Sequence, residues 1–160
     1  MSKKSRVKIG LALGGGSAKG MSYIGLLRVF EKHKIQIDYI SGTSIGALIG
    51  GLYCAGYSPD EMEKIISELN WKRMLDFNDF GNGLIRGNRI EKWLRKVLKG
   101  KQFKDLRIPF AASAVDIHNG EEVIFESGDV AKAIHASIAI PGVFSPVAIN
   151  HRHYVDGGVV

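Results

Sequence analysis

Ser44 is the residue whose surroundings point most directly to chemistry. It lies in the stretch Gly-Thr-Ser-Ile-Gly, with Gly42 and Gly46 on either side, between an apolar segment and an Ala/Leu/Ile/Gly run. A nucleophilic serine at a sharp strand-to-helix turn needs small neighbours at these positions, because the turn crowds the backbone. The helix N-terminus behind it would favour developing negative charge. The alternative is a serine that only caps the helix.

A second candidate is the glycine-rich loop Gly-Gly-Gly-Ser-Ala-Lys-Gly at residues 14–20. Its backbone N–H groups can converge on an anion, either a nucleotide phosphate or a reaction oxyanion. A P-loop requires Gly-Lys-Ser/Thr, whereas alanine precedes Lys19 here. The dinucleotide fingerprint fails too, because its middle glycine would fall on Ser17 when counted back from Gly20. An oxyanion hole that faces a serine at the tip of the neighbouring strand explains both loops together.

A nucleophilic serine also needs a base, and Asp156 is the leading candidate. It lies in Val-Asp-Gly-Gly, directly after an alternating segment, and Gly157 and Gly158 open the backbone around it. An aspartate held next to a serine hydroxyl can accept its proton, while the oxyanion hole carries most of the charge stabilisation. The alternative is an ordinary Asp-Gly turn.

The histidines are weaker candidates for the base. No catalytic motif surrounds any of the five histidines, which are His33, His118, His135, His151 and His153. His135 falls within a predicted helix, where a structural histidine is the default. No histidine follows Asp156, so the usual serine–acid–histidine order would need another acid, such as Asp116, with His135, His151 or His153.

The predicted elements bring these residues to the ends of strands. A strand over 7–15, a helix over 18–34, a strand over 35–42 and a helix that opens at Ser44 imply a parallel sheet with right-handed crossovers. Further helices are predicted over 58–70, 88–100 and from 129 up to Pro141. A hairpin is predicted from 108–117 and 121–127, and 146–160 alternates around a turn near 150–153.

Composition is typical of one globular domain, with 160 residues, 45% hydrophobic and 24% charged. The single Cys54 is expected to be a buried, inert thiol, which fits a reducing compartment. The apolar run Ile9–Leu13 is too short for a signal peptide, and no segment approaches the ~20 apolar residues of a membrane span. A cytoplasmic location, with peripheral attachment to a membrane, is therefore expected.

The net charge of +6 favours an acidic partner surface such as anionic lipid or nucleic acid. Basic residues concentrate in a segment that reads as a helix: Lys92, Arg95, Lys96, Lys99 and Lys101. The alternative is a solvated helix face with loose counterions.

Four blocks in this order, LGGGSAKG, GTSIG, ASIAIPGVFSP and VDGG, resemble the patatin-like phospholipases, which are serine acyl hydrolases with a Ser–Asp dyad. The resemblance covers residues 7–160 and leaves 1–6 as a basic tail. It implies a three-layer α/β/α sandwich with a mainly parallel central sheet. It also implies that Ser44 is the nucleophile and Asp156 the general base. The remaining motif residues are then the oxyanion loop Gly14, Gly15, Gly16, Ser17 and Lys19, and the glycines Gly20, Gly42, Gly46, Gly157 and Gly158.

The resemblance also gives roles to two other segments. The segment 136–144 would pack near the dyad, with Pro141 and Phe144 lining an acyl site. The aromatic segment 71–87 would form a cap that meets lipid, or else contribute ordinary core aromatics. Family members usually continue with further strands and helices beyond residue 160, so a C-terminally truncated domain is one interpretation.

The function predicted from the sequence is hydrolysis of fatty acyl esters of phospholipids or lysophospholipids through an acyl-enzyme, with no metal or cofactor and no nucleic acid partner. Three alternatives stay open: a catalytically silent lipid-binding or interaction module, a nucleotide-binding module that uses residues 14–20, and an acyltransferase.

Overall fold

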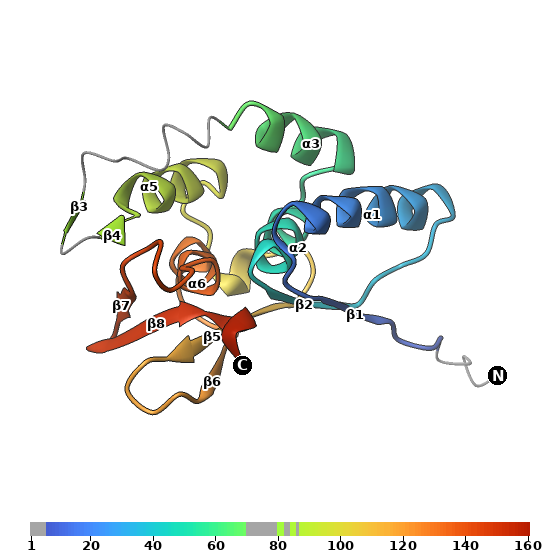
Figure 1. Ribbon diagram of the computed structural model, residues 1–160. Coiled ribbons are helices and arrows are strands. Elements are labelled where there is room, and N and C mark those ends of the chain that lie inside the picture. Colours follow the sequence, from blue (N-terminus) through green and yellow to red (C-terminus); the bar gives the residue numbers. More distant parts are fainter. Residues whose placement is uncertain (1–5, 70–79, 82–83, 86) are drawn as a thin grey trace.

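A computed structural model of the chain describes residues 6–69, 80–81, 84–85 and 87–160 (Figure 1). The predicted aromatic cap therefore lies largely outside the described residues. The elements in chain order are β1 (Gly10–Leu13), η1 (Ser17–Met21), α1 (Ser22–Lys32), β2 (Tyr39–Thr43), α2 (Ile45–Ala55), α3 (Pro59–Ser67), β3 (Phe80–Gly81), β4 (Leu84–Ile85), α5 (Asn88–Val97), η2 (Phe103–Asp105), β5 (Phe110–Asp116), β6 (Glu122–Phe125), α6 (Val130–Ser137), β7 (Val147–Ile149), β8 (Arg152–Asp156) and η3 (Gly157–Val159).

The main sheet combines a parallel half with an antiparallel half. β1, β2 and β5 are parallel neighbours, with Leu13 opposite Gly42 and Ile40 opposite Phe110. β6 and β8 pair with β5 in the antiparallel sense, and β7 adds to β8. A mixed sheet flanked by helices confirms the predicted α/β class.

The helices are stacked over one face of this sheet. β1, β2 and β5 follow one another in a single direction across the sheet, so right-handed crossovers carry their connecting helices to the same side. α2 packs on β2 and β5, and α6 packs on β5 and β8. Figure 1 shows α1, α3 and α5 further from the sheet, beyond α2 and α6. The described α-helices thus supply one helical layer of the predicted sandwich.

The core lies between the sheet and α2, and the composition of α2 reflects this position. Nine of the eleven residues of α2 are buried, because the helix has the sheet on one side and α1 and α3 on the other. A helix covered on all sides is apolar all round, whereas α3 at the surface is amphipathic. α3 begins after the N-cap Ser58, which forms a capping box with Glu61.

Several predicted boundaries can be compared with the structure. The β5–β6 hairpin is confirmed, and so is the turn between β7 and β8, where Asn150 and His151 have φ of 48° and 63°. The first helix begins as a 3-10 turn at Ser17 and becomes α-helical only at Ser22. α6 ends at Ser137, short of the predicted Pro141. Just beyond its end, the Ala139 carbonyl bonds to the sheet, where it accepts from the Asp156 amide.

Candidate active site

β5 brings the ends of β2 and β8 together. Ala112 and Ser113 pair with both β2 and β6, so those two strands lie on opposite edges of β5. Ala114 pairs with both β6 and β8, so β8 shares the edge that β2 occupies. Because Thr43 is opposite Ser113 and Asp156 is opposite Ala114, the two strands end at adjacent positions of the same edge. Ser44 and Asp156 therefore meet despite their separation in sequence.

Ser44 lies on the sharp turn that the sequence predicted. It directly follows β2 and precedes α2, and its backbone has φ 56° and ψ −125°. Positive φ is strained for a residue with a side chain. Close backbone approach requires the flanking glycines, since a Cβ on Gly42 would lie 2.5 Å from the Gly46 oxygen, and one on Gly46 would lie 2.0 Å from the Leu13 oxygen.

The side chain of Ser44 contacts a carboxylate and does not cap the helix. It occupies the N-cap position of α2 but makes no capping hydrogen bond. Its Oγ instead donates to Oδ2 of Asp156 at 2.7 Å. The other carboxylate oxygen accepts from the Gly158 amide at 2.8 Å, which fixes the orientation of the buried carboxylate. This arrangement can draw a proton from the hydroxyl of Ser44.

The glycine-rich loop lies beside Ser44. A Cβ on Gly15 would be 3.6 Å from Cβ of Ser44, which brings the loop backbone next to the nucleophile candidate. Gly16 has φ 150°, a conformation that residues with side chains rarely adopt. Lys19 is exposed, and its amide donates to the Gly16 carbonyl. The loop thus has the backbone freedom and the position that an oxyanion hole needs.

The remaining motif glycines mark close contacts around the same centre. A Cβ on Gly20 would lie 2.2 Å from Cγ2 of Ile45, at the start of α2. A Cβ on Gly157 would lie 2.6 Å from Oγ of Ser113 on β5. Both glycines therefore let the segments on either side of the Ser44–Asp156 pair pack closely.

Ser137 was not among the residues predicted from the sequence. Its Oγ, fully buried at the end of α6, accepts a hydrogen bond from the Ser44 amide at 2.9 Å. Ser137 lies in the block ASIAIPGVFSP, but no role was predicted for it, because a serine near a helix end is common.

Asp116, the acid of the alternative triad, is engaged elsewhere, and His135 packs against another helix. The buried carboxylate of Asp116 accepts from the His118 amide and from Arg152, and these bonds lower its pKa. His135 is buried against α5, with Nδ1 3.4 Å from Oε2 of Glu91. Burial also raises the pKa of the Cys54 thiol to about 12, as expected for an inert cysteine.

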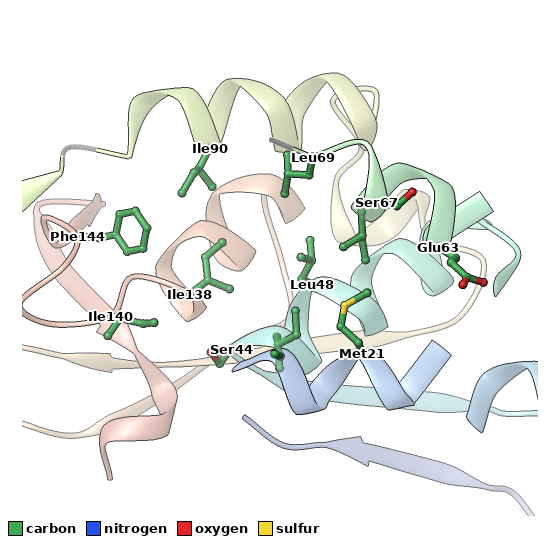
Figure 2. Close-up of a pocket in the computed structure, with 13 residues that line it drawn as sticks. Met21, Ser44, Leu48, Glu63, Ser67, Leu69, Ile90, Ile138, Ile140 and Phe144 are labelled. Atoms are coloured by element: carbon green, nitrogen blue, oxygen red, sulfur yellow. The ribbon is translucent and has the colours of Figure 1, made fainter. Parts of the chain in front are cut away.

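A cavity of about 690 Å³ opens beside Ser44 and has mostly apolar walls. Residues from several elements line it, including Met21, Leu48, Ile66, Ile90, Ile138 and Phe144. Figure 2 shows Ser44 at the floor, Phe144 and Ile140 toward one end, and Ser67 and Glu63 toward the other. Of the two residues predicted to line an acyl site, Phe144 lines this cavity, whereas Pro141 is exposed and forms no part of its wall.

Neither metal ligands nor a membrane span emerge in the parts of the chain that the structure describes. No cluster there of three or more His, Cys, Asp or Glu side chains could hold a metal ion. Among the same residues, no helix is both long and apolar enough to cross a bilayer.

Known proteins resemble this chain in both sequence and fold. An uncharacterised NTE family protein of Mycobacterium tuberculosis is 34% identical over 158 residues, which are 98% of this chain and 44% of the relative. Lysophospholipase NTE1 of Candida albicans is 32% identical over 96% of this chain and 12% of its own length. The chain thus spans less than half the length of these relatives.

Two solved structures share the fold at low sequence identity. VipD from Legionella pneumophila matches with a TM-score of 0.78 and 17% identity over 95% of this chain and 46% of VipD. The type III effector protein ExoU matches with a TM-score of 0.63 and 16% identity over 85% of this chain and 41% of ExoU. The family model of patatin-like phospholipases matches residues 11–160, and the chain therefore belongs to the patatin-like phospholipase family.

Proposed function

We propose that this chain is a lipid acyl hydrolase in which Ser44 and Asp156 form a catalytic dyad. The observation that carries the proposal is the 2.7 Å contact from Ser44 Oγ to Asp156 Oδ2, on the floor of an apolar cavity. Membership of the patatin-like phospholipase family supports the same reaction class. A strained serine that contacts a carboxylate instead of capping its helix favours a nucleophile over a structural serine.

In the acylation step, Ser44 Oγ attacks the ester carbonyl carbon while Asp156 takes the hydroxyl proton. The carbonyl oxygen becomes an oxyanion, and the candidates to stabilise it are backbone amides of the glycine-rich loop, which passes beside Ser44 at Gly15. Collapse of the tetrahedral intermediate breaks the ester C–O bond. The alcohol leaves with the proton that Asp156 received, and the acyl group stays on Ser44.

In the deacylation step, Asp156 takes a proton from water, and the resulting hydroxide oxygen bonds to the acyl carbon. The ester bond to Ser44 then breaks, and the proton returns to Ser44 Oγ. The products are the free fatty acid and the regenerated serine, so the reaction requires no metal or cofactor.

The substrate class follows from the cavity and from the named relatives. A cavity of this size and apolar character suits a fatty acyl chain. The relatives that are named lysophospholipases favour phospholipid or lysophospholipid esters as the substrates of this chain.

A basic surface on α5 supports peripheral attachment to anionic membranes. Two members of the predicted basic cluster are engaged: Arg95 pairs with Glu91 and Asp129, and Lys101 donates to the Asp105 carbonyl. The remaining Lys92, Lys96 and Lys99 are exposed, and no carboxylate of the described residues pairs with them. We call these three, Lys92 and Lys96 on α5 and Lys99 just after its end, the α5 lysine face. Since Ile90 of α5 also lines the cavity, a membrane bound there would lie close to the proposed active site.

Labelling with a fluorophosphonate probe tests the dyad. The probe is expected to modify Ser44 alone, and Ser44→Ala is expected to remove both labelling and hydrolysis of a short-chain p-nitrophenyl ester. Asp156→Asn should lose kcat/KM about as severely, by several orders of magnitude, because members of one catalytic unit are not additive. Folding of each variant is checked by circular dichroism.

The histidines provide the matched comparison. Each His→Ala variant should keep kcat/KM within roughly tenfold of the wild type, about 1.4 kcal/mol in the barrier. The dyad is wrong if a folded histidine variant is inactive while Asp156→Asn remains active. Lipid binding by a folded protein that the probe does not label would instead indicate a catalytically silent module.

A further inference from the structure

The backbone amide of Ser44 lacks a partner within its own elements. β2 ends at Thr43 and α2 begins at Ile45, so this N–H belongs to neither the sheet ladder nor the helix. A main-chain N–H that is withdrawn from water without an acceptor costs free energy comparable to a lost hydrogen bond. The acceptor here is Ser137 Oγ at 2.9 Å, a side chain from a distant part of the sequence.

Ser137 is held rigidly. It is the last residue of α6 and has no exposed surface. α6 packs on β5, β8 and α2, and all but one of its residues are buried. The hydroxyl therefore has a fixed position relative to the sheet from which Ser44 emerges.

The short segment that begins at Ser137 also bonds to Asp156, the hydrogen-bond partner of Ser44. The carbonyl of Ala139, two residues after Ser137, accepts from the Asp156 amide at 2.9 Å. One stretch of three residues thus bonds to the backbones of both Ser44 and Asp156, which lie at the ends of different strands.

We propose that Ser137 is a positioning residue whose hydroxyl keeps the Ser44 backbone in the strained conformation that directs Oγ toward Asp156. The proposal rests on the proposed function of the Ser44–Asp156 pair. A residue with φ of 56° keeps this conformation only where its surroundings enforce it. Without the acceptor, the turn can relax and carry Oγ away from the carboxylate. Ser137 acts through Ser44 and needs no contact with the substrate.

The first test separates the hydrogen bond from packing. Ser137→Ala is expected to lower kcat roughly 10- to 100-fold, because misplacement of a reacting group by about 1 Å has effects of that order. KM is expected to change less than about threefold, since the cavity that binds the acyl chain remains. Ser137→Cys fills the site with a poor acceptor, so it should lose kcat as Ser137→Ala does.

Ser113→Ala is the matched control. Ser113 is also buried, and its hydroxyl bonds to Thr43 Oγ1 at 2.6 Å, one residue before Ser44. This variant loses a comparable hydrogen bond but leaves the Ser44 amide paired, so its kcat should stay within about threefold of the wild type. Equal losses of kcat and of thermal stability in Ser113→Ala and Ser137→Ala would overturn the proposal in favour of general packing.

Hydrogen exchange gives a readout that does not depend on catalysis. The Ser44 amide should exchange faster in Ser137→Ala than in the wild type, while the amides inside α2 keep their protection. An unchanged Ser44 amide would overturn the positioning role. This measurement remains informative if the wild type hydrolyses no ester, an outcome that would count against the proposed function instead.

Discussion

Ser44 illustrates how local strain and side-chain chemistry combine in one residue. An N-cap serine usually satisfies a free N–H of its helix, yet Ser44 makes no such bond. Its hydroxyl is directed to Asp156 by a backbone conformation that is costly for serine. Strained residues persist where the surrounding structure enforces them, and they concentrate at functional sites. The glycines around Ser44 are part of that enforcement.

Replacement of Gly46 should therefore be severe. A Cβ there would meet the backbone oxygens of Leu13 at 2.0 Å and of Gly14 at 2.7 Å, and neither can rotate away. Gly46→Ala is expected to lower the free energy of unfolding by about 2 kcal/mol or more, as overpacking does. It should also lower esterase activity, because Gly14 belongs to the proposed oxyanion loop. Chemical denaturation measures the first effect and kcat/KM the second.

Gly25→Ala is the control for this change. Gly25 is an exposed residue of α1, and a Cβ there meets no atom within 4 Å. Alanine is the better helix former, so this variant should gain up to about 1 kcal/mol. A Gly46→Ala protein as stable as the wild type would contradict the close contact between α2 and β1.

At this scale, the sequence identified residues that stand in a short recognisable pattern. Gly42 is required by the local turn and Gly46 by the approach of Leu13, but both have the spacing of the Gly-Thr-Ser-Ile-Gly pattern, which is visible in the sequence. The role of Ser137 depends on a contact with a residue 93 positions away, so although the segment 136–144 was expected near the dyad, Ser137 itself was not singled out. Pro141 is exposed and does not line the cavity, so its predicted place at an acyl site gains no support.

At the scale of elements, β5 serves as the template for the site. It aligns the end of β2 with the end of β8 on one edge. Hydrophobic patterns predicted most strands and helices, because those patterns are local. The register that puts Thr43 and Asp156 at adjacent positions of β5 has no such signal, and neither does the early end of α6. Both depend on which segments meet in the folded chain.

The packing of α5 against α6 predicts a pH-dependent stability. His135 of α6 is buried, and burial lowers its pKa, although the Glu91 carboxylate on α5 acts in the opposite direction. Lys132 also lowers it, and Arg95 binds the same carboxylate. Between this lowered value and the ordinary pKa of about 6.5, the unfolded chain binds more protons than the folded one. Stability is therefore lost as the pH falls through that window.

His135→Gln is expected to remove this contribution. The fall in the unfolding free energy between pH 7.5 and 5.5, measured by urea denaturation, should be smaller in His135→Gln than in the wild type. His33→Gln, at the exposed end of α1, leaves His135 in place and should retain the wild-type fall. Identical pH dependence in the wild type and His135→Gln would rule out His135 as the titrating group.

At the scale of the whole molecule, attraction to an anionic surface depends more on where the basic residues lie than on the net charge. The net charge is +6, but some of the basic residues are compensated locally. Arg28, for example, is paired with Asp60 and Glu63 near the cavity, and Arg95 is paired with two carboxylates. The sequence alone could not distinguish paired from unpaired basic residues, so the predicted cluster of five reduces to the α5 lysine face.

The α5 lysine face should bind anionic vesicles in a salt-dependent manner. Each basic residue near an anionic surface contributes roughly 1 kcal/mol, so the change of Lys92, Lys96 and Lys99 to glutamine should weaken binding about a hundredfold. Binding of the wild type should also weaken as salt rises, since screening acts within about 8–10 Å at physiological ionic strength. Co-sedimentation with vesicles of phosphatidylcholine, with and without phosphatidylglycerol, measures both effects.

A second triple variant separates the place of the charges from their number. Lys8, Lys32 and Lys34 are exposed outside α5, at the start of β1 and the end of α1. Their change to glutamine lowers the net charge by the same amount but leaves the α5 lysine face intact. If attraction depends on this face, the control triple binds anionic vesicles nearly as the wild type does. Equal weakening in both triples would mean that net charge alone draws the protein to the membrane. Binding that ignores both salt and phosphatidylglycerol would mean that the α5 lysines are merely solvated.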